Sequence, residues 1–125
     1  MKIYFYSSLI AFSLSITHSA HADDLEKGKA IYNGIGACAA CHGALGKGDG
    51  AASAALNPKP RDFSVGVFAI DTDKDGKTGT ETDLSNVIEK GAAVFGGSPL
   101  MAARADIAPA DRKALVAYIL SLKTK

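Results

Sequence analysis

Cys38 and Cys41 are the only cysteines in the sequence, and His42 follows them directly, giving Cys38-Ala39-Ala40-Cys41-His42. This Cys-x-x-Cys-His spacing is typical of covalent haem attachment. Each thiol can add to one vinyl group on the same edge of a haem, and the histidine can then turn its imidazole toward the iron. The pattern predicts one haem c, attached through Cys38 and Cys41, with His42 as an iron ligand. Such a chain must fold around a flat cofactor.

Three other uses of the two thiols fit less well. A redox-active dithiol of the thioredoxin type needs a strand and helix setting, and no segment shows a strand alternation. A disulfide is common in exported proteins, but across so short a loop it would constrain little of the unfolded chain. A zinc site of the usual kind needs four ligands, and beyond residue 22 the chain has no further Cys or His.

A second axial ligand must come from another part of the chain. Beyond residue 22, His42 is the only histidine and Met101 the only methionine. A lone methionine ordinarily fills a gap in a core, but Met101 ends the run GGSPLM, whose glycines and proline favour an irregular loop that can hold a ligand. We predict Met101 as the sixth ligand. His/Met ligation raises the reduction potential and leaves no open iron position, which favours electron transfer over catalysis.

Residues 1–22 have the outline of a secretory signal peptide. Lys2 is followed by the apolar run Ile3–Ile16 and by Ala20-His21-Ala22, a small-x-small cleavage pattern. The run is shorter than the ~20 residues that a membrane-spanning helix needs. We therefore predict removal of residues 1–22 on export, a periplasmic location, and no stable membrane insertion afterwards.

Charge in the remaining segment, residues 23–125, is balanced. Lys2 is one of the 14 Lys and Arg, so this segment keeps 13 of them against 13 Asp and Glu. Zero net charge excludes nucleic acid or an anionic membrane as an obvious electrostatic partner. The segment also holds all 13 glycines, so much of its core is expected to be the cofactor, and folding without haem is expected to be poor.

Three segments carry a helical period: about Asp24–Gly36, Asp83–Lys90 and Pro109–Leu122. Thr82 or Asp83 can cap the second helix, and Pro109 suits the first turn of the third. The predicted fold class is all-α, with three to four short helices and long loops.

Gly28 and Tyr32 lie on the apolar stripe of the first predicted helix. One interpretation is a helix that tolerates a glycine at a cost of about 1 kcal/mol. The other is that the missing side chain lets the last helix cross closely, with Tyr118 beside Tyr32. The pattern favours neither.

Taken together, the sequence resembles the class I cytochrome c family across residues 23–125. The resemblance rests on the first helix with Gly28 and Tyr32, the Cys38–His42 motif followed by Gly43, the Pro99-Leu100-Met101 loop, and the last helix with its sequence Leu115–Ile119.

The resemblance implies one cytochrome c domain over residues 23–125, with the first and last helices crossing at nearly a right angle. It implies attachment and ligation by the residues predicted above. It also implies that a proline carbonyl accepts a hydrogen bond from the ring of His42, with Pro58 and Pro60 as the candidates.

One segment departs from the family pattern. Asp71, Asp73, Asp75 and Gly76 match positions 1, 3, 5 and 6 of a calcium loop. Position 12 is Thr82 where a bidentate Glu is expected. Calcium binding by the three aspartates and an acidic surface turn are both compatible with the sequence, and the turn is favoured.

These features predict a monomeric electron carrier, not an enzyme, that docks larger redox proteins at the haem edge near Ala40, Gly43 and residues 98–100. Two other functions remain open. One is a haem c subunit of a larger respiratory or sulfur-compound-oxidising complex. The other is a haem sensor or enzyme in which Met101 is displaceable, although the chain lacks a second histidine for peroxidase chemistry.

Overall fold

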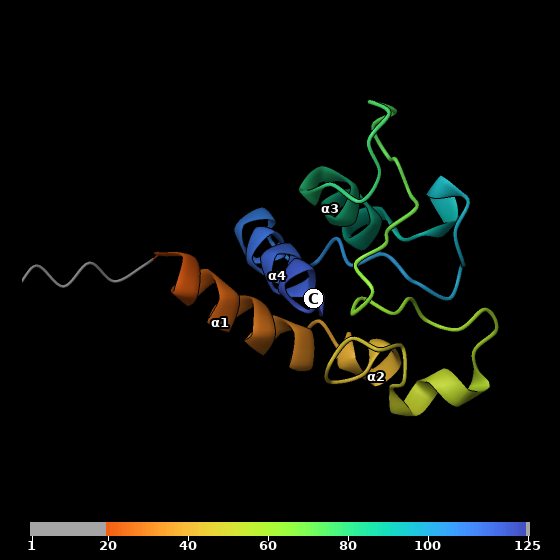
Figure 1. Ribbon diagram of the computed structural model, residues 1–125, viewed down its shortest axis with the longest axis horizontal. Coiled ribbons are helices and arrows are strands. Elements are labelled where there is room, and N and C mark those ends of the chain that lie inside the picture. The colour runs from red at the N-terminus through yellow and green to blue at the C-terminus, as the bar shows by residue number, and fades with distance from the viewer. Residues whose placement is uncertain (1–19, 125) are drawn as a thin grey trace, which may run out of the picture.

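The computed structural model describes residues 20–124, in which short helices are joined by long irregular segments (Figure 1). The elements are α1 (Ala20–Asn33), α2 (Ala39–His42), the 3-10 turn η1 (Ala51–Ala55), α3 (Glu81–Lys90), the 3-10 turn η2 (Ala93–Phe95) and α4 (Pro109–Ser121). Within residues 20–124 there is no strand, which confirms the predicted all-α class.

The helix α1 ends three residues before the predicted end at Gly36. The amide of Gly36 donates to the carbonyl of Ile31 at 2.8 Å, one residue farther back than in an α-helix, and Ala37 has a φ of 51°. This wider turn takes the chain out of the helix. Ile35, expected on the buried stripe, therefore lies beyond the helix and is 68% exposed.

The helix α3 begins two residues earlier than predicted, and its cap is Thr80, which corrects the assignment to Thr82 or Asp83. The Thr80 hydroxyl accepts from the amide of Asp83, and the Asp83 carboxylate accepts from the amide of Thr80. This reciprocal pair is a capping box, a motif that satisfies two backbone donors at a helix start. Asp83 was predicted as a possible cap, whereas it is the third residue of the helix and supplies the acidic side chain of the capping box.

The first and last helices cross at Gly28. Figure 1 shows α1 lengthwise and α4 nearly along its axis, so the crossing is steep. A Cβ atom on Gly28 would overlap the carbonyl of Ala114 and lie 2.8 Å from Cβ of Tyr118. Tyr32 and Tyr118 meet edge to face, with ring centroids 5.3 Å apart. The second interpretation of Gly28, a close helix crossing, is confirmed.

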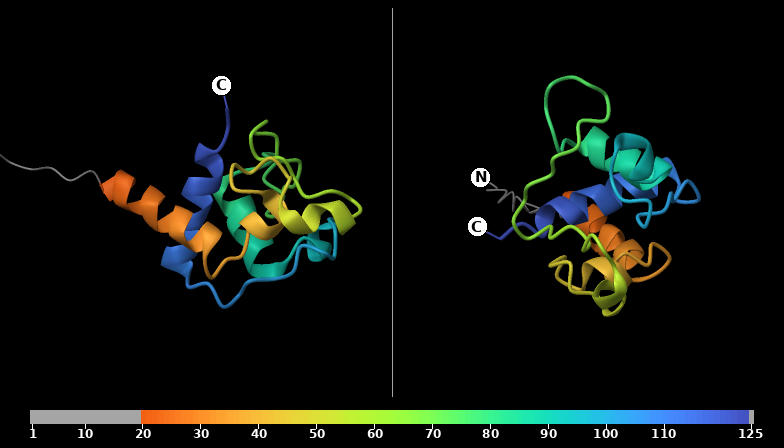
Figure 2. Two further views of the ribbon diagram at one scale, coloured as in Figure 1. Left: turned by 90° about the horizontal axis from the view of Figure 1, so that it is seen from below. Right: turned by 90° about the vertical axis from the view of Figure 1, so that its right-hand side faces the viewer.

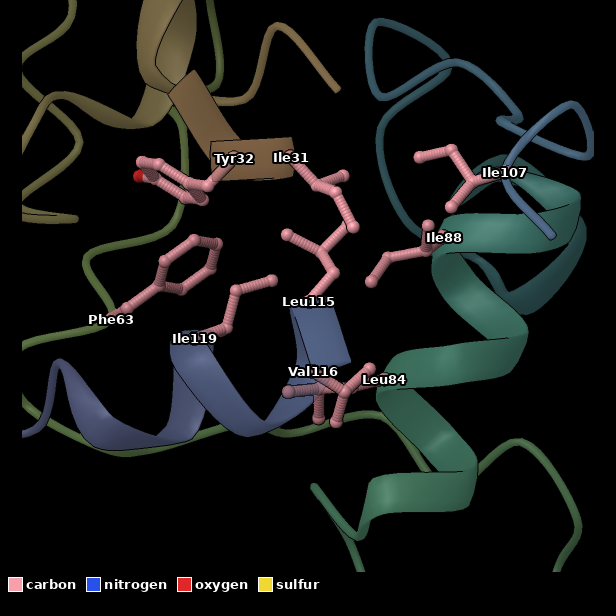
Figure 3. Packing of buried hydrophobic residues seen from close by; sticks show 9 residues of the cluster. All are labelled: Ile31, Tyr32, Phe63, Leu84, Ile88, Ile107, Leu115, Val116 and Ile119. Carbon is pink, nitrogen blue, oxygen red and sulfur yellow. The ribbon is translucent and has the colours of Figure 1, made fainter. Parts of the chain in front are cut away.

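The hydrophobic core lies between α1, α3 and α4, and Phe63 closes it from an irregular segment (Figure 3). Tyr32 and Leu115 are fully buried at its centre. Its members are Ile31, Tyr32, Phe63, Leu84, Ile88, Ile107, Leu115, Val116 and Ile119.

The helix α3 is joined to α4 by a buried arginine as well as by apolar contacts. Arg112 donates to the hydroxyl of Ser85 and to the carbonyl of Ile107, both at 3.0 Å, and pairs with Glu89 at 3.2 Å. The two views of Figure 2 show α3 beside α4 and the green segment before α3 projecting as an open loop.

Most of the predicted signal peptide, residues 1–19, lies outside the described residues. Its predicted cleavage triplet, residues 20–22, forms the first turn of α1, where His21 and Ala22 are exposed. In the part of the chain that the structure describes, no helix is both long and apolar enough to cross a membrane.

Candidate functional site

Within the motif, Ala39–His42 form one helical turn, α2, and Cys38 is the residue that caps its start. The amide of His42 donates to the carbonyl of Cys38 at 2.8 Å, and the amide of Gly43 donates to the carbonyl of Ala39 at 2.9 Å. Cys38 and Cys41 are free and half-buried, whereas His42 is buried. The turn therefore places both thiols and the imidazole on one short element.

The glycine-rich segment 43–50 folds back on α2. The amide of Gly48 donates to the carbonyl of His42 at 2.8 Å, and that of Gly50 donates to the carbonyl of Cys41 at 3.1 Å. These bonds satisfy carbonyls that a one-turn helix leaves free at its end. The buried hydroxyl of Tyr32 donates to the carbonyl of Gly43 at 2.7 Å, which joins the helix crossing to the motif.

The ring of His42 is fixed from two directions by one segment of chain. Its Nδ1 donates to the carbonyl of Arg61 at 2.9 Å, and its face stacks on Phe63 with centroids 4.3 Å apart and planes inclined by 19°. Burial lowers the pKa of His42, and the hydrogen bond to Arg61 opposes this in part. The imidazole is thus neutral with the Nε2 lone pair free, which is the form that binds a metal.

The acceptor for His42 corrects the sequence analysis. The predicted acceptors were the carbonyls of Pro58 and Pro60, whereas the structure uses Arg61, the residue after Pro60. The carbonyl of Pro60 instead lies against the glycine-rich segment, where a Cβ atom on Gly48 would come within 2.5 Å of it. Any residue can supply a backbone carbonyl, so no side-chain signal marks Arg61 for this role.

The thiol of Cys38 belongs to a half-buried side chain. Burial raises the pKa of its thiol, and the positive charge of Arg104 opposes this in part. The thiol therefore remains protonated at neutral pH.

Met101 is half-buried and packs against the same core cluster as Cys38 and Phe68. Its carbonyl accepts from the amide of Ala92 at 3.1 Å, and its amide donates to the carbonyl of Ser98 at 3.2 Å. The predicted sixth ligand and one predicted attachment residue, Cys38, therefore both pack against the core cluster.

The donor set fits a haem c. Two free thiols at the required spacing, a neutral imidazole with one nitrogen free, and a thioether packed on the same core are the groups that attach and ligate this cofactor. Large apolar side chains are also exposed on the segments that flank these groups: Ile35, Leu45, Val94 and Leu100.

The alternatives for the thiols gain no support. Cys38 and Cys41 are not joined in a disulfide. Among residues 20–124, the donor atoms of Cys38, Cys41 and His42 do not converge as a three-ligand group, and a thioredoxin-type dithiol lacks its strand.

The residues predicted to surround the docking edge differ in their exposure to solvent. Ala40, Pro99 and Leu100 are exposed and Ser98 is half-buried. Gly43 itself is buried and its carbonyl accepts from the Tyr32 hydroxyl, so docking at this edge stays a prediction.

The acidic loop before α3 groups Asp71 and Asp73 with Asp83, their ligand oxygens lying within 4.8 Å of one another, whereas Asp75 lies outside the group. The carboxylate of Asp83 accepts four hydrogen bonds, from the amides and hydroxyls of Thr72 and Thr80. Burial would raise the pKa of Asp83, but these bonds outweigh it and lower the pKa to about 2. They account for the buried charge without a metal ion, and calcium binding stays a prediction.

Sequence reasoning missed three residues that shape this site. Arg61 contributes only its backbone, and Phe63 stands in a segment without periodicity. Arg104 was given no role from the sequence, although its guanidinium donates to the carbonyls of Ile35 and Gly36, just before the motif. The proximity of Arg104 to the Met101 loop in sequence is the one signal that could have drawn attention to it.

Comparison with known proteins agrees with this geometry. The sequence model for cytochrome c matches residues 25–123. A similar solved structure is a chain of the Kuenenia stuttgartiensis reducing HAO-like protein complex Kustc0457/Kustc0458, with 31% sequence identity and a TM-score of 0.64. The match covers 78% of this chain and 42% of that chain, so this chain corresponds to less than half of its neighbour. No curated protein matches the sequence. The extent of the family match establishes that the chain belongs to the cytochrome c family of electron-transferring haem proteins.

Proposed function

We propose that the chain is a periplasmic carrier of single electrons, with one haem c bound through Cys38 and Cys41 and ligated by His42 and Met101. The observation that carries this proposal is the placement of His42: a buried imidazole that follows the two thiols, donates through Nδ1 to the carbonyl of Arg61 and stacks on Phe63. The domain would comprise residues 23–125 after removal of residues 1–22.

The chain's own residues would keep reorganisation small when an electron arrives or leaves. The haem iron supplies the Fe(II)/Fe(III) couple when bound. Arg61 and Phe63 hold the imidazole in one plane, and the glycine-rich segment fixes the turn from which it projects. The thioether of Met101 is a soft ligand that raises the reduction potential. With both axial positions filled by side chains, substrate chemistry at the metal is disfavoured.

The first experiment is an absorption spectrum of the purified holoprotein in both redox states. We expect a c-type reduced spectrum and, in the oxidised protein, the weak red band of an iron(III)–thioether bond. Met101→Ala should abolish that band, whereas Val94→Ala, a change at an exposed apolar position of the neighbouring segment, should keep it. A high-spin ferric spectrum of the wild-type protein would contradict the proposed ligation.

Export has its own test. We expect the protein isolated from the periplasm to begin at Asp23, as judged by N-terminal sequencing, and its intact mass to equal residues 23–125 plus one haem. A mature protein that keeps residues 1–22 would contradict the proposed removal of the leader.

A second candidate function is a haem c subunit of a larger complex. The observation in its favour is the similarity to part of a chain in the reducing HAO-like protein complex. Light scattering on natively expressed, gently purified protein decides between the two. A mass near one copy of residues 23–125 supports the free carrier, and a stable heteromeric mass supports the subunit.

A further inference from the structure

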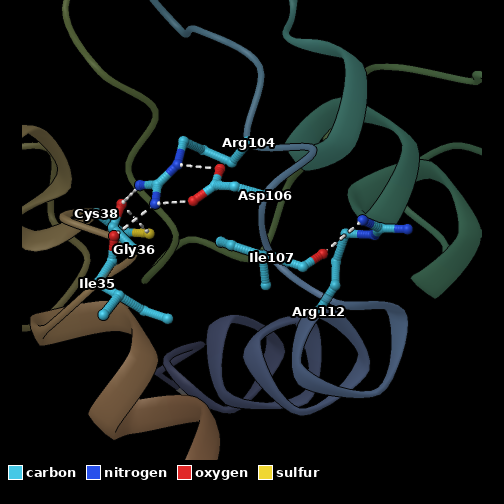
Figure 4. Close-up of polar contacts among 7 residues, drawn as sticks. All are labelled: Ile35, Gly36, Cys38, Arg104, Asp106, Ile107 and Arg112. Atoms are coloured by element: carbon cyan, nitrogen blue, oxygen red, sulfur yellow. Dashed lines mark hydrogen bonds and ion pairs between the residues drawn. The ribbon is translucent and has the colours of Figure 1, made fainter.

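Arg104 reaches across the molecule to the turn that precedes the haem motif. Figure 4 shows its guanidinium between Asp106 and the backbone of the turn beside Cys38. Its Nη1 donates to the carbonyl of Gly36 and its Nη2 to the carbonyl of Ile35, each at 2.6 Å. Both carbonyls are close in sequence to Cys38, and Arg104 follows Met101 by three residues.

The guanidinium is held in one orientation by Asp106. The carboxylate of Asp106 accepts from Nε at 2.9 Å and from Nη2 at 2.8 Å, a two-point pairing that fixes the plane of the group. The Arg104 side chain is 26% exposed and that of Asp106 is 63% exposed, so the ion pair faces water and the bond to the carbonyl of Gly36 is the more protected contact. Charge-assisted bonds are stronger than those between neutral groups.

The backbone of Arg104 is anchored as well. Its amide donates to the carbonyl of Ile88 near the end of α3 at 2.7 Å, and its carbonyl accepts from the amide of Ile107 at 3.2 Å. One residue therefore joins α3, the segment that carries Met101 and the turn that carries Cys38. The backbone of Met101 makes two hydrogen bonds of its own, to Ala92 and Ser98, which both lie within ten residues of it in the sequence.

We propose that Arg104 is a positioning residue that holds the Met101 segment against the attachment turn and so keeps the thioether on the iron. This inference rests on the proposed function. The thioether bonds at Cys38 and Cys41 would retain the haem without Arg104, but the Met101 segment would then open more readily and admit an external ligand. The planar five-donor fork of arginine serves two carbonyls and one carboxylate at once, which a lysine ammonium cannot.

Titration of the ferric holoprotein with imidazole, followed by loss of the red thioether band, tests the proposal. Imidazole binds only when Met101 leaves, so its apparent affinity reports the opening of this segment. We expect Arg104→Ala to raise that affinity by about tenfold or more, as the loss of charge-assisted hydrogen bonds implies. Arg104→Lys should rescue little of this, and Asp106→Asn should raise the affinity less than Arg104→Ala does.

The matched control is Arg112→Ala, which removes the buried arginine that joins α4 to Ser85 of α3 and to the carbonyl of Ile107 and makes no contact with the attachment turn. It should lower global stability in urea and leave the imidazole affinity near the wild-type value. An unchanged affinity in both Arg104 variants, or the same increase in Arg112→Ala, would overturn the proposal while the wild-type band still supports Met101 ligation. Absence of the band in the wild-type protein would instead overturn the proposed function together with this inference.

Discussion

The two proposed axial ligands are held in very different ways. His42 projects from a helical turn, its carbonyl accepts from Gly48, its Nδ1 donates to Arg61, and Phe63 covers its face. Met101 lies in an irregular segment and depends on two backbone bonds nearby and on Arg104 three residues later.

This difference shows how one fold can assign unequal roles to its two ligands. The His42 side chain is held by a hydrogen bond and a stacked ring from residues 61–63, so we expect it to move only together with that segment. The Met101 side chain has apolar packing alone, and its segment is tied through its backbone and Arg104, so we expect it to open more readily. Substitutions on the two sides should therefore differ in stability cost, and four predictions test this.

The largest effect is expected at Phe63 on the His42 side. Phe63→Ala removes a buried ring that stacks on His42 and faces the core, and should lower the free energy of unfolding by about 3–5 kcal/mol. Phe95→Ala, at a half-buried ring in η2 on the Met101 side, is the matched change and should cost less. Urea unfolding of both variant holoproteins measures the two losses of unfolding free energy. Equal losses would contradict the proposed difference between the His42 and Met101 sides.

Gly48 is next. Its φ is +73°, and a Cβ atom there would lie 2.5 Å from the carbonyl of Pro60. Gly48→Ala therefore combines backbone strain with a backbone clash and should cost about 3 kcal/mol. The urea midpoint of the variant holoprotein measures this loss of stability. An unchanged midpoint, with as much holoprotein formed as in the wild type, would show that the glycine-rich segment adjusts to the added methyl group.

Gly96 provides the corresponding change on the Met101 side. Its φ is +80°, but a Cβ atom there meets nothing within 4 Å. Gly96→Ala should therefore cost only the conformational strain, about 1–2 kcal/mol. The same unfolding experiment applies, and a cost as large as that of Gly48→Ala would remove the distinction between the two sides.

The smallest effect is expected at Leu100, which is 54% exposed beside Met101. Leu100→Ala should change the free energy of unfolding by no more than about 0.5 kcal/mol. The red thioether band should persist. A loss of several times this size in the holoprotein would mean that Leu100 is covered by the cofactor, and the Met101 side would then be less open than its contacts indicate.

The sequence was sufficient to locate the three longer helices, although not the ends of α1 and α3, and to name candidates for attachment and ligation. Periodicity and Pro109 placed α4 nearly correctly, because that helix begins at the proline and ends one residue before the predicted limit. The thiols, imidazole and thioether are each the only ones of their kind beyond residue 22, so composition alone identified the candidates for attachment and ligation.

Long-range backbone contacts could not be predicted. Neither the carbonyl that accepts from His42 nor those that accept from Arg104 leave any trace in residue type, since every residue carries a carbonyl. The crossing at Gly28 was visible as one of two alternatives, and only the placement of Ala114 against it decided between them.

Tyr32 links the docking of the last helix to the turn that carries the thiols. Its ring belongs to the contact with Tyr118 in the last helix, while its hydroxyl holds the carbonyl that follows His42. A chain in which α4 has not yet docked lacks half of this arrangement. The turn that carries the thiols is therefore expected to be held less firmly until the last helix docks.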